Sequence, residues 1–137
     1  MKISLQGRSA LITGGSEGLG KGMAIRFAES GADVAIVARR PEILEAAKAE
    51  VDAAGNGKVV ALPCDLLDPA ATVQTFKDAE QALGKVDILV NNAGTSRAKP
   101  FESVTDEEWY EDLELKLMAA VRLCRNALPA MKQRKWG

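Results

Sequence analysis

The sequence predicts an α/β fold with a parallel β-sheet, and two observations support this prediction. Four short apolar runs alternate along the chain with segments in which apolar residues recur at helical spacing. Strands that alternate with helices form a parallel sheet through right-handed crossovers. In addition, the first apolar run passes through a glycine-rich turn directly into a helical pattern. No low-complexity tract, linker or repeat interrupts residues 1–137, so we expect a single domain.

The four expected strands are short apolar runs of the kind that lie buried in a parallel sheet, and they cover residues 8–14, 33–38, 58–63 and 86–90. The helical patterns cover residues 18–30, 41–55, 69–84 and about 106–132. Gly31 stops the first helix, and Pro41 opens the second at its first position. Asp68 caps the third, and Thr105 with Glu108 forms a capping box for the last.

Composition excludes several classes of protein. The 137 residues carry a net charge of −1, and acidic and basic residues are interspersed, which is not the pattern of a nucleic-acid or membrane surface. The N-terminus lacks the apolar segment and cleavage site of a leader, and no later stretch is long enough to span a bilayer. We therefore expect a cytoplasmic protein with no nucleic-acid or membrane partner.

The histidine and cysteine content narrows the chemistry further. Histidine is absent, which rules out within this sequence a Ser-His-Asp triad, a Cys-His pair and His-ligated zinc. Cys64 and Cys124 lie far apart and have no paired metal spacing. We expect two reduced, buried thiols and no metal site.

The turn from Thr13 to Gly20 reads Thr-Gly-Gly-Ser-Glu-Gly-Leu-Gly and suits a dinucleotide pyrophosphate. Gly14 allows a sharp exit from the strand, while Gly18 and Gly20 lack the side chains that would hold a phosphate off the backbone and the helix off the sheet. The N–H groups at the positive end of the next helix then face the anion. Because the spacing only partly meets Gly-x-Gly-x-x-Gly, a structural glycine corner remains an alternative on this motif alone.

A second motif, Asn91-Asn92-Ala93-Gly94, follows the fourth expected strand, and Asp65 follows the third. Together with Thr-Gly-x-x-x-Gly-x-Gly, in this order and at this spacing, they resemble the short-chain dehydrogenase/reductase family over essentially the whole chain. The resemblance implies a Rossmann-like, doubly wound sheet in which the four strands lie in the order 3-2-1-4. It also implies hydride transfer between a nicotinamide cofactor and a small-molecule carbonyl or alcohol substrate.

The resemblance further implies which residues bind the cofactor. Those at the pyrophosphate are Gly14, Ser16, Glu17, Gly18, Leu19 and Gly20. Those around the adenine and in the nucleoside pocket are Asp65, Leu66, Asn91, Ala93 and Gly94. Taken alone, Asn91 and Asn92 also fit a strand-ending turn whose side chains bond the local backbone.

Cofactor choice depends on the residues after the second strand. Relatives that prefer NAD usually carry an acidic residue where this chain has Ala38. Arg39 can instead pair with a 2′-phosphate, and Arg40 either assists or stays solvated. A hydrogen bond to a charged partner contributes roughly 1.5 to 3 kcal/mol, which is about ten- to a hundredfold in affinity. Glu17 argues against NADP, because many NADP-using relatives have a basic residue there. On balance, Ala38 and Arg39 lead us to predict NADP, with NAD as the alternative.

The catalytic residues of the family are expected beyond this sequence. There a serine follows the fifth strand, and the tyrosine of a Tyr-x-x-x-Lys motif on the next helix moves the substrate proton. The chain ends where the fifth strand would begin, so we expect an incomplete domain that carries only the cofactor-binding half. Tyr110 has Leu113 and Glu114 where a lysine partner would stand and is interpreted as a packing residue. Lys116 matches the position of a proton-relay asparagine in many relatives, and it is either functional or a solvated or snorkelling lysine.

The last helix is apolar on more than one face, and the fourth strand is an open edge. One face carries Leu113, Leu117, Cys124 and Leu128, and another carries Leu115, Met118 and Leu123. In the family this helix also packs against its counterpart in a neighbouring subunit, so we predict a homo-oligomer through this helix. The loop from Thr95 to Val104 is expected to be too short to define a substrate pocket. The alternative to an oxidoreductase half is a non-catalytic nucleotide-binding or oligomer-assembly module.

Overall fold

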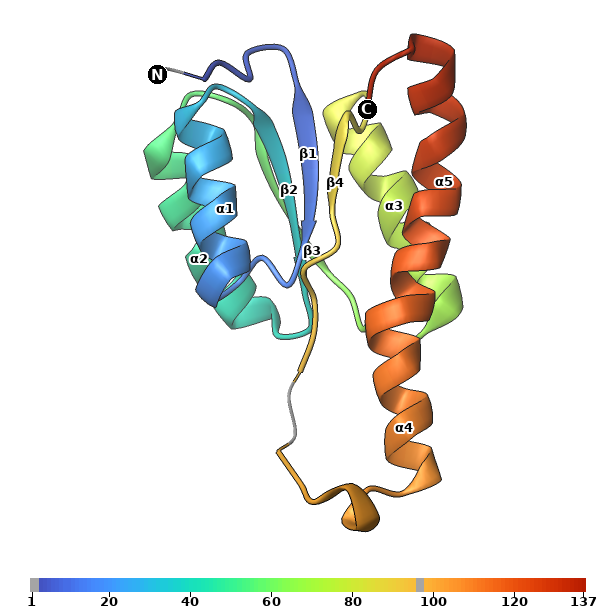
Figure 1. Ribbon diagram of the computed structural model, residues 1–137. Coiled ribbons are helices and arrows are strands. Elements are labelled where there is room, and N and C mark those ends of the chain that lie inside the picture. The colour runs from blue at the N-terminus through green and yellow to red at the C-terminus, as the bar shows by residue number, and fades with distance from the viewer. Residues whose placement is uncertain (1–2, 96–97) are drawn as a thin grey trace.

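The computed structural model describes residues 3–95 and 98–137; Met1, Lys2, Ser96 and Arg97 lie outside the described residues. The elements before the fourth strand are β1 (Ser9–Thr13), α1 (Gly18–Glu29), β2 (Asp33–Ala38), α2 (Pro41–Ala54), β3 (Val59–Pro63) and α3 (Pro69–Leu83). Then follow β4 (Ile88–Val90), the 3-10 turn η1 (Phe101–Ser103), α4 (Asp106–Leu113), the π-helical turn η2 (Glu114–Met118) and α5 (Ala119–Arg134). Figure 1 shows them in sequence colours.

The four strands form one parallel sheet in the order β3-β2-β1-β4, which confirms the predicted topology. Helices α1 and α2 cover one face of the sheet, and α3 and α5 cover the other (Figure 1). Successive strand residues point to opposite faces, so Ile12 and Ile36 pack under α1 and α2. Leu11 and Val37 face the other core, which includes Phe76 of α3. Both faces of the sheet are covered, and the strands are therefore apolar except at their ends.

The local signals at the helix ends behave as predicted. Pro41 is the first residue of α2, and the Asp68 side chain accepts hydrogen bonds from Ala70 N and Ala71 N at the start of α3. Gly84 ends α3 in the left-handed conformation, with φ +82°. The expected capping box of Thr105 and Glu108 is present at α4. Each of these helix ends depends on residues close together in the chain, so each could be predicted from the sequence.

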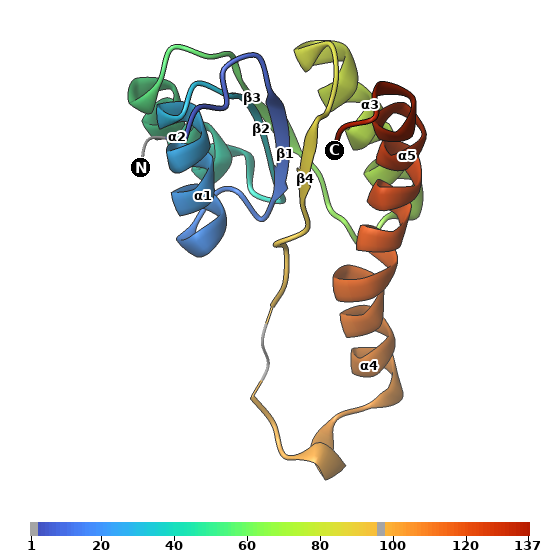
Figure 2. The ribbon, with the colours of Figure 1, turned by 45° about the horizontal axis from the view of Figure 1, so that its top comes forward.

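The last helix differs from the expected regular helix. A π-helical turn, η2, separates α4 from α5. Figure 2 shows α4 running out beyond the end of the sheet, beside the loop that carries η1. Tyr110 lies in this projecting part with 70% of its surface exposed, so its interpretation as a packing residue is wrong.

The two apolar faces of this helix have different environments. Leu123 is buried against the sheet together with Ala119 and Ala127. Leu113, Leu117 and Leu128 are all about half exposed. Across the part of the chain that the structure describes, no helix has both the length and the apolar character needed to cross a membrane.

Candidate dinucleotide site

The glycine turn after β1 brings the start of α1 against the end of the strand. Gly14 and Gly18 both adopt the left-handed conformation, with φ +64° and +54°, which glycine adopts without strain. A Cβ built on Gly20 would lie 2.1 Å from the carbonyl oxygen of Gly14, so the helix approaches the turn too closely for any side chain there. A Cβ on Gly18 would meet no atom within 4 Å, and the turn is open on that side. The turn therefore has one packed and one open side, as a phosphate cradle requires.

Thr13 and Asn92 fix this turn to the end of β4. The Thr13 hydroxyl oxygen accepts hydrogen bonds from Asn92 N and Ala93 N, each 3.0 Å long. The Asn92 side-chain amide donates to Thr13 O at 3.0 Å and to Gly14 O at 3.3 Å. These carbonyls belong to the end of β1 and to the turn after it, not to the local backbone that the alternative interpretation of Asn92 supposed. Thr13 belongs to the glycine-turn motif, and Asn92 belongs to the motif after the fourth strand. The motifs alone did not predict a hydrogen bond between these two residues.

A cleft of about 510 Å³ opens at the carboxyl ends of the strands. The predicted residues that line it are Gly14, Ser16, Glu17, Gly18, Leu19, Arg39, Arg40, Leu66, Ala93 and Gly94. Six further residues line the cleft that were not predicted to bind the cofactor, although the sequence analysis had singled out the positions of Ala38 and Asn92: Val37, Ala38, Cys64, Asn92, Thr95 and Leu115. The β1–β4 junction is the point where the strand order reverses, and ligands of doubly wound sheets bind at such a switch point.

Three predicted cofactor residues do not line this cleft. Gly20 is buried behind the turn. Asp65 is exposed, and its carboxylate accepts a hydrogen bond from Leu67 N at 3.1 Å in the loop before α3. The Asn91 side-chain amide donates to the sulfur of Cys124 at 3.5 Å. Asn91 and Asn92 both follow β4, and their side chains reach different places: Asn92 bonds to the glycine turn, and Asn91 bonds to α5.

Charged side chains lie at the mouth of the cleft, near the connection between β2 and α2. Arg40 forms an ion pair with Glu17 of the glycine turn. Arg39 is exposed and has no ion-pair partner among residues 3–95 and 98–137. Its guanidinium is therefore available to an anion in the cleft.

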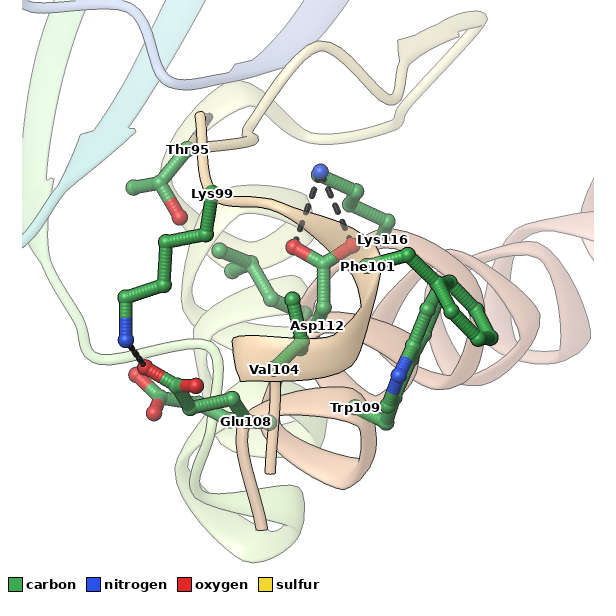
Figure 3. Close-up of a pocket in the computed structure, with 10 residues that line it drawn as sticks. Thr95, Lys99, Phe101, Val104, Glu108, Trp109, Asp112 and Lys116 are labelled. Atoms are coloured by element: carbon green, nitrogen blue, oxygen red, sulfur yellow. Dashed lines mark hydrogen bonds and ion pairs between the residues drawn. The ribbon is translucent and has the colours of Figure 1, made fainter. Parts of the chain in front are cut away.

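A second cavity of about 300 Å³ adjoins the cleft and shares Thr95 and Leu115 with it (Figure 3). Phe101 and Trp109 stack edge to face on its apolar side, with ring centroids 6.3 Å apart. Four residues between the end of β4 and α4 line this cavity together with residues of α4 and η2: Thr95, Lys99, Phe101 and Val104. That the loop alone is too short to define a substrate pocket stays a prediction, because the helical residues supply the rest of the lining.

Lys116 lies at this second cavity, and Figure 3 shows it turned toward Asp112. Its ammonium nitrogen is 2.8 Å from Asp112 Oδ1, one helical turn earlier. The aliphatic stem passes close to Gly94, where a Cβ would lie 3.7 Å from Lys116 Cε. The side chain is exposed and ion-paired, and it lines the second cavity but not the main cleft.

The two cysteines differ, and the expectation that both are buried is wrong for Cys124. Cys64 is buried in the wall of the cleft, and burial raises the pKa of its thiol above the usual range. Cys124 lies on α5 next to buried Leu123, but it is exposed, and its sulfur accepts the hydrogen bond from Asn91.

Thiol-specific reagents should distinguish the two cysteines. The thiolate is the reactive form, so the raised pKa and burial of Cys64 slow its reaction at pH 8 by about tenfold or more relative to Cys124. Labelling followed by mass spectrometry should show one fast thiol in the folded protein and two after unfolding. Cys124→Ser should remove the fast phase; two equally fast thiols in the folded protein would contradict this structure.

A parallel sheet in the order 3-2-1-4 with a glycine turn at its switch point defines a Rossmann-type dinucleotide-binding fold. Comparison with known proteins agrees with this class. The family model for short chain dehydrogenases matches residues 8–137, and the chain belongs to that family.

Individual relatives give the same result. A short chain dehydrogenase of Pseudocercospora fijiensis is 38% identical over 135 residues, which are 97% of this chain and 43% of that protein. L-Sorbose reductase of Gluconobacter frateurii, crystallised with NADPH and L-sorbose, superposes with a TM-score of 0.92 at 35% identity, over 98% of this chain and 51% of its own. A metagenomic short-chain oxidoreductase in complex with NADP has a TM-score of 0.89 at 34% identity, over 100% of this chain and 61% of its own. The chain spans about half the length of the curated relatives it matches.

Proposed function

We propose that this chain is the cofactor-binding half of an NADP-dependent oxidoreductase that acts on a carbonyl or alcohol substrate. The observation that carries the proposal is the cleft at the switch point, with its open glycine turn and an unpaired arginine at the mouth. Family membership and two neighbours crystallised with NADPH or NADP support it. When bound, the dinucleotide supplies or accepts a hydride at its nicotinamide ring.

Different residues of this chain bind different parts of the cofactor. Backbone N–H groups between Gly14 and Gly20, at the positive end of α1, bind the pyrophosphate. Arg39 pairs with the 2′-phosphate, and Leu66 with Ala93 encloses the adenosine. Lys116 stays a candidate for the substrate end, because its ammonium lies beside the second cavity and its stem touches the Gly94 region. The serine and Tyr-x-x-x-Lys motif of the family are not in this sequence, so hydride transfer is proposed for the whole protein.

Replacing Arg39 tests the cofactor assignment. We expect Arg39→Ala to weaken NADP⁺ binding about ten- to a hundredfold and to change NAD⁺ binding less than about twofold, because only NADP⁺ carries the extra phosphate. Isothermal titration calorimetry of the chain with each dinucleotide measures both affinities. Arg26→Ala is the matched control, since Arg26 pairs with Glu29 on the exposed side of α1 and lies outside the cleft. Equal losses for both dinucleotides would remove Arg39 as the phosphate partner.

The alternative, an oligomer-assembly module, is favoured by one observation. Leu113 of α4, Leu117 of η2 and Leu128 of α5 are exposed leucines, and Tyr110 of α4 is exposed as well. Exposed apolar patches mark protein interfaces. Whether the chain self-associates through these side chains, with or without a cofactor, is decided by light scattering of the chain and of Leu117→Glu.

A further inference from the structure

The ion pair between Glu17 and Arg40 joins the starts of two helices at the mouth of the cleft. Glu17 is the residue before α1, and Arg40 is the residue before α2. Neither side chain caps its own helix. Both side chains remain about three-fifths exposed, at 62% and 61%, so the pair stays accessible to a ligand. Both residues also line the cleft.

The pair changes the charge that a ligand meets. Arg39 and Arg40 are adjacent in the chain, and both line the cleft, but the carboxylate of Glu17 holds only Arg40. Lys21, the next cation along α1, is directed to Glu50 of α2 at 2.9 Å and does not neutralise Glu17. A phosphate monoester carries a charge of about −1.5 to −2 at pH 7. Such a group is attracted by Arg39, while Glu17 both repels it and competes with it for Arg40.

Helix stabilisation does not explain the pair. Exposed ion pairs add little to stability, and the Glu17 side chain makes no hydrogen bond to the start of α1. The Lys21–Glu50 pair already joins α1 to α2 and lies outside the cleft lining. The position of the Glu17–Arg40 pair at the cleft mouth is therefore the feature that sets it apart.

We propose, building on the NADP assignment above, that Glu17 is a specificity-determining residue that holds Arg40 away from the cofactor. Arg39 then acts as the main partner of the 2′-phosphate. Glu17 thereby lowers the preference of the site for the phosphorylated dinucleotide over the unphosphorylated one. Removing its charge releases Arg40 and raises that preference.

Isothermal titration calorimetry of the full chain with NADP⁺ and with NAD⁺ tests this. In Glu17→Gln we expect the ratio of the two affinities to rise about three- to tenfold in favour of NADP⁺, because the released Arg40 gives the 2′-phosphate one further charged partner. In the double variant Glu17→Gln/Arg40→Gln the ratio should return to about the wild-type value, because the gain acts through the released arginine. Glu50→Gln is the matched control: it breaks the other ion pair between α1 and α2, and the ratio should stay within about twofold of wild type.

The outcomes separate the two proposals. If wild type binds NADP⁺ and Glu17→Gln leaves the ratio unchanged, the role of Glu17 is overturned and the NADP assignment stands. A rise of the same size in Glu50→Gln also overturns it, because the effect would then come from overall charge. A rise that persists in the double variant shows that Arg40 is not involved and overturns the proposed route. If wild type binds neither dinucleotide, the proposed function fails, and this inference fails with it.

Discussion

Gly20→Ala is expected to destabilise the protein by about 3 kcal/mol and to abolish dinucleotide binding, the effect of forcing atoms into a closely packed site. The new methyl group would lie 2.1 Å from the Gly14 carbonyl oxygen and 2.5 Å from the Asn92 side-chain nitrogen. Neither neighbouring atom can move without a loss of stability. The first is backbone, and the second is held by Thr13 O and Gly14 O. Helix α1 must therefore shift away from the turn, which separates its N–H groups from the cradle they form.

Gly22→Ala is the matched control in the same helix. A Cβ on Gly22 would meet no atom within 4 Å. Because alanine favours helix more than glycine does, this variant should be more stable by about 0.5 to 1 kcal/mol. Urea unfolding followed by circular dichroism measures the stability of both variants, and calorimetry with NADP⁺ measures binding. If Gly20→Ala unfolds at the same urea concentration as Gly22→Ala, the close approach of α1 to the turn is absent from the protein.

The sheet could be predicted from the sequence because its signals are local and agree with one another. Apolar runs such as residues 33–38 read as buried strands, and both faces of the sheet are indeed covered. The strand order itself came from the family resemblance, since nothing local in β4 says that it pairs with β1. The shared cleft followed from the rule that the carboxyl ends of parallel strands lie at one edge.

Two physical causes explain the wrong predictions about the last helix. The spacing of its apolar residues identifies several apolar faces, but it does not say which one the sheet will take. The π-helical turn η2 adds to this, because one extra residue rotates later side chains by about 100° relative to earlier ones. The face that carries Leu123 is buried, while Tyr110 and Cys124 are left outside.

The details of the site depend on contacts between distant parts of the chain. The family resemblance placed Asp65 at the adenine, whereas in the structure its carboxylate accepts a hydrogen bond from Leu67 N and does not line the cleft. Glu17 and Arg40 are 23 residues apart, and only the fold makes them partners. A sequence motif thus located the edge of the sheet at which the cleft opens, and the pairing of charges there became visible only in three dimensions.

Asp87→Ala is expected to cost about 3 kcal/mol of stability, the scale measured when one partner of a buried charge pair is removed. Asp87 is 1% exposed and lies just before β4, at the end of the sheet opposite the cleft. Its carboxylate accepts a hydrogen bond from Ser9 N at 3.2 Å and lies 3.0 Å from Lys85 Nζ. Arg134, at the end of α5, approaches it at 3.5 Å. One buried carboxylate therefore joins β1, β4 and the last helix.

Asp52→Ala is the control for this prediction, because it removes a carboxylate from an exposed ion pair with Lys48 at i, i+4. Such pairs contribute about 0.3 to 0.5 kcal/mol, so this variant should unfold almost as wild type does in urea. Arg8 also lies 3.6 Å above the ring of Trp136 and 4.0 Å from Asp87. Loss of the carboxylate should therefore loosen the end of α5 before the chain unfolds, seen as faster amide hydrogen exchange in residues 128–134. Asp87→Ala could instead destabilise the protein no more than Asp52→Ala and leave that exchange unchanged. Arg8, Lys85 and Arg134 would then be solvated rather than bound to Asp87, and apolar packing alone would anchor the end of α5.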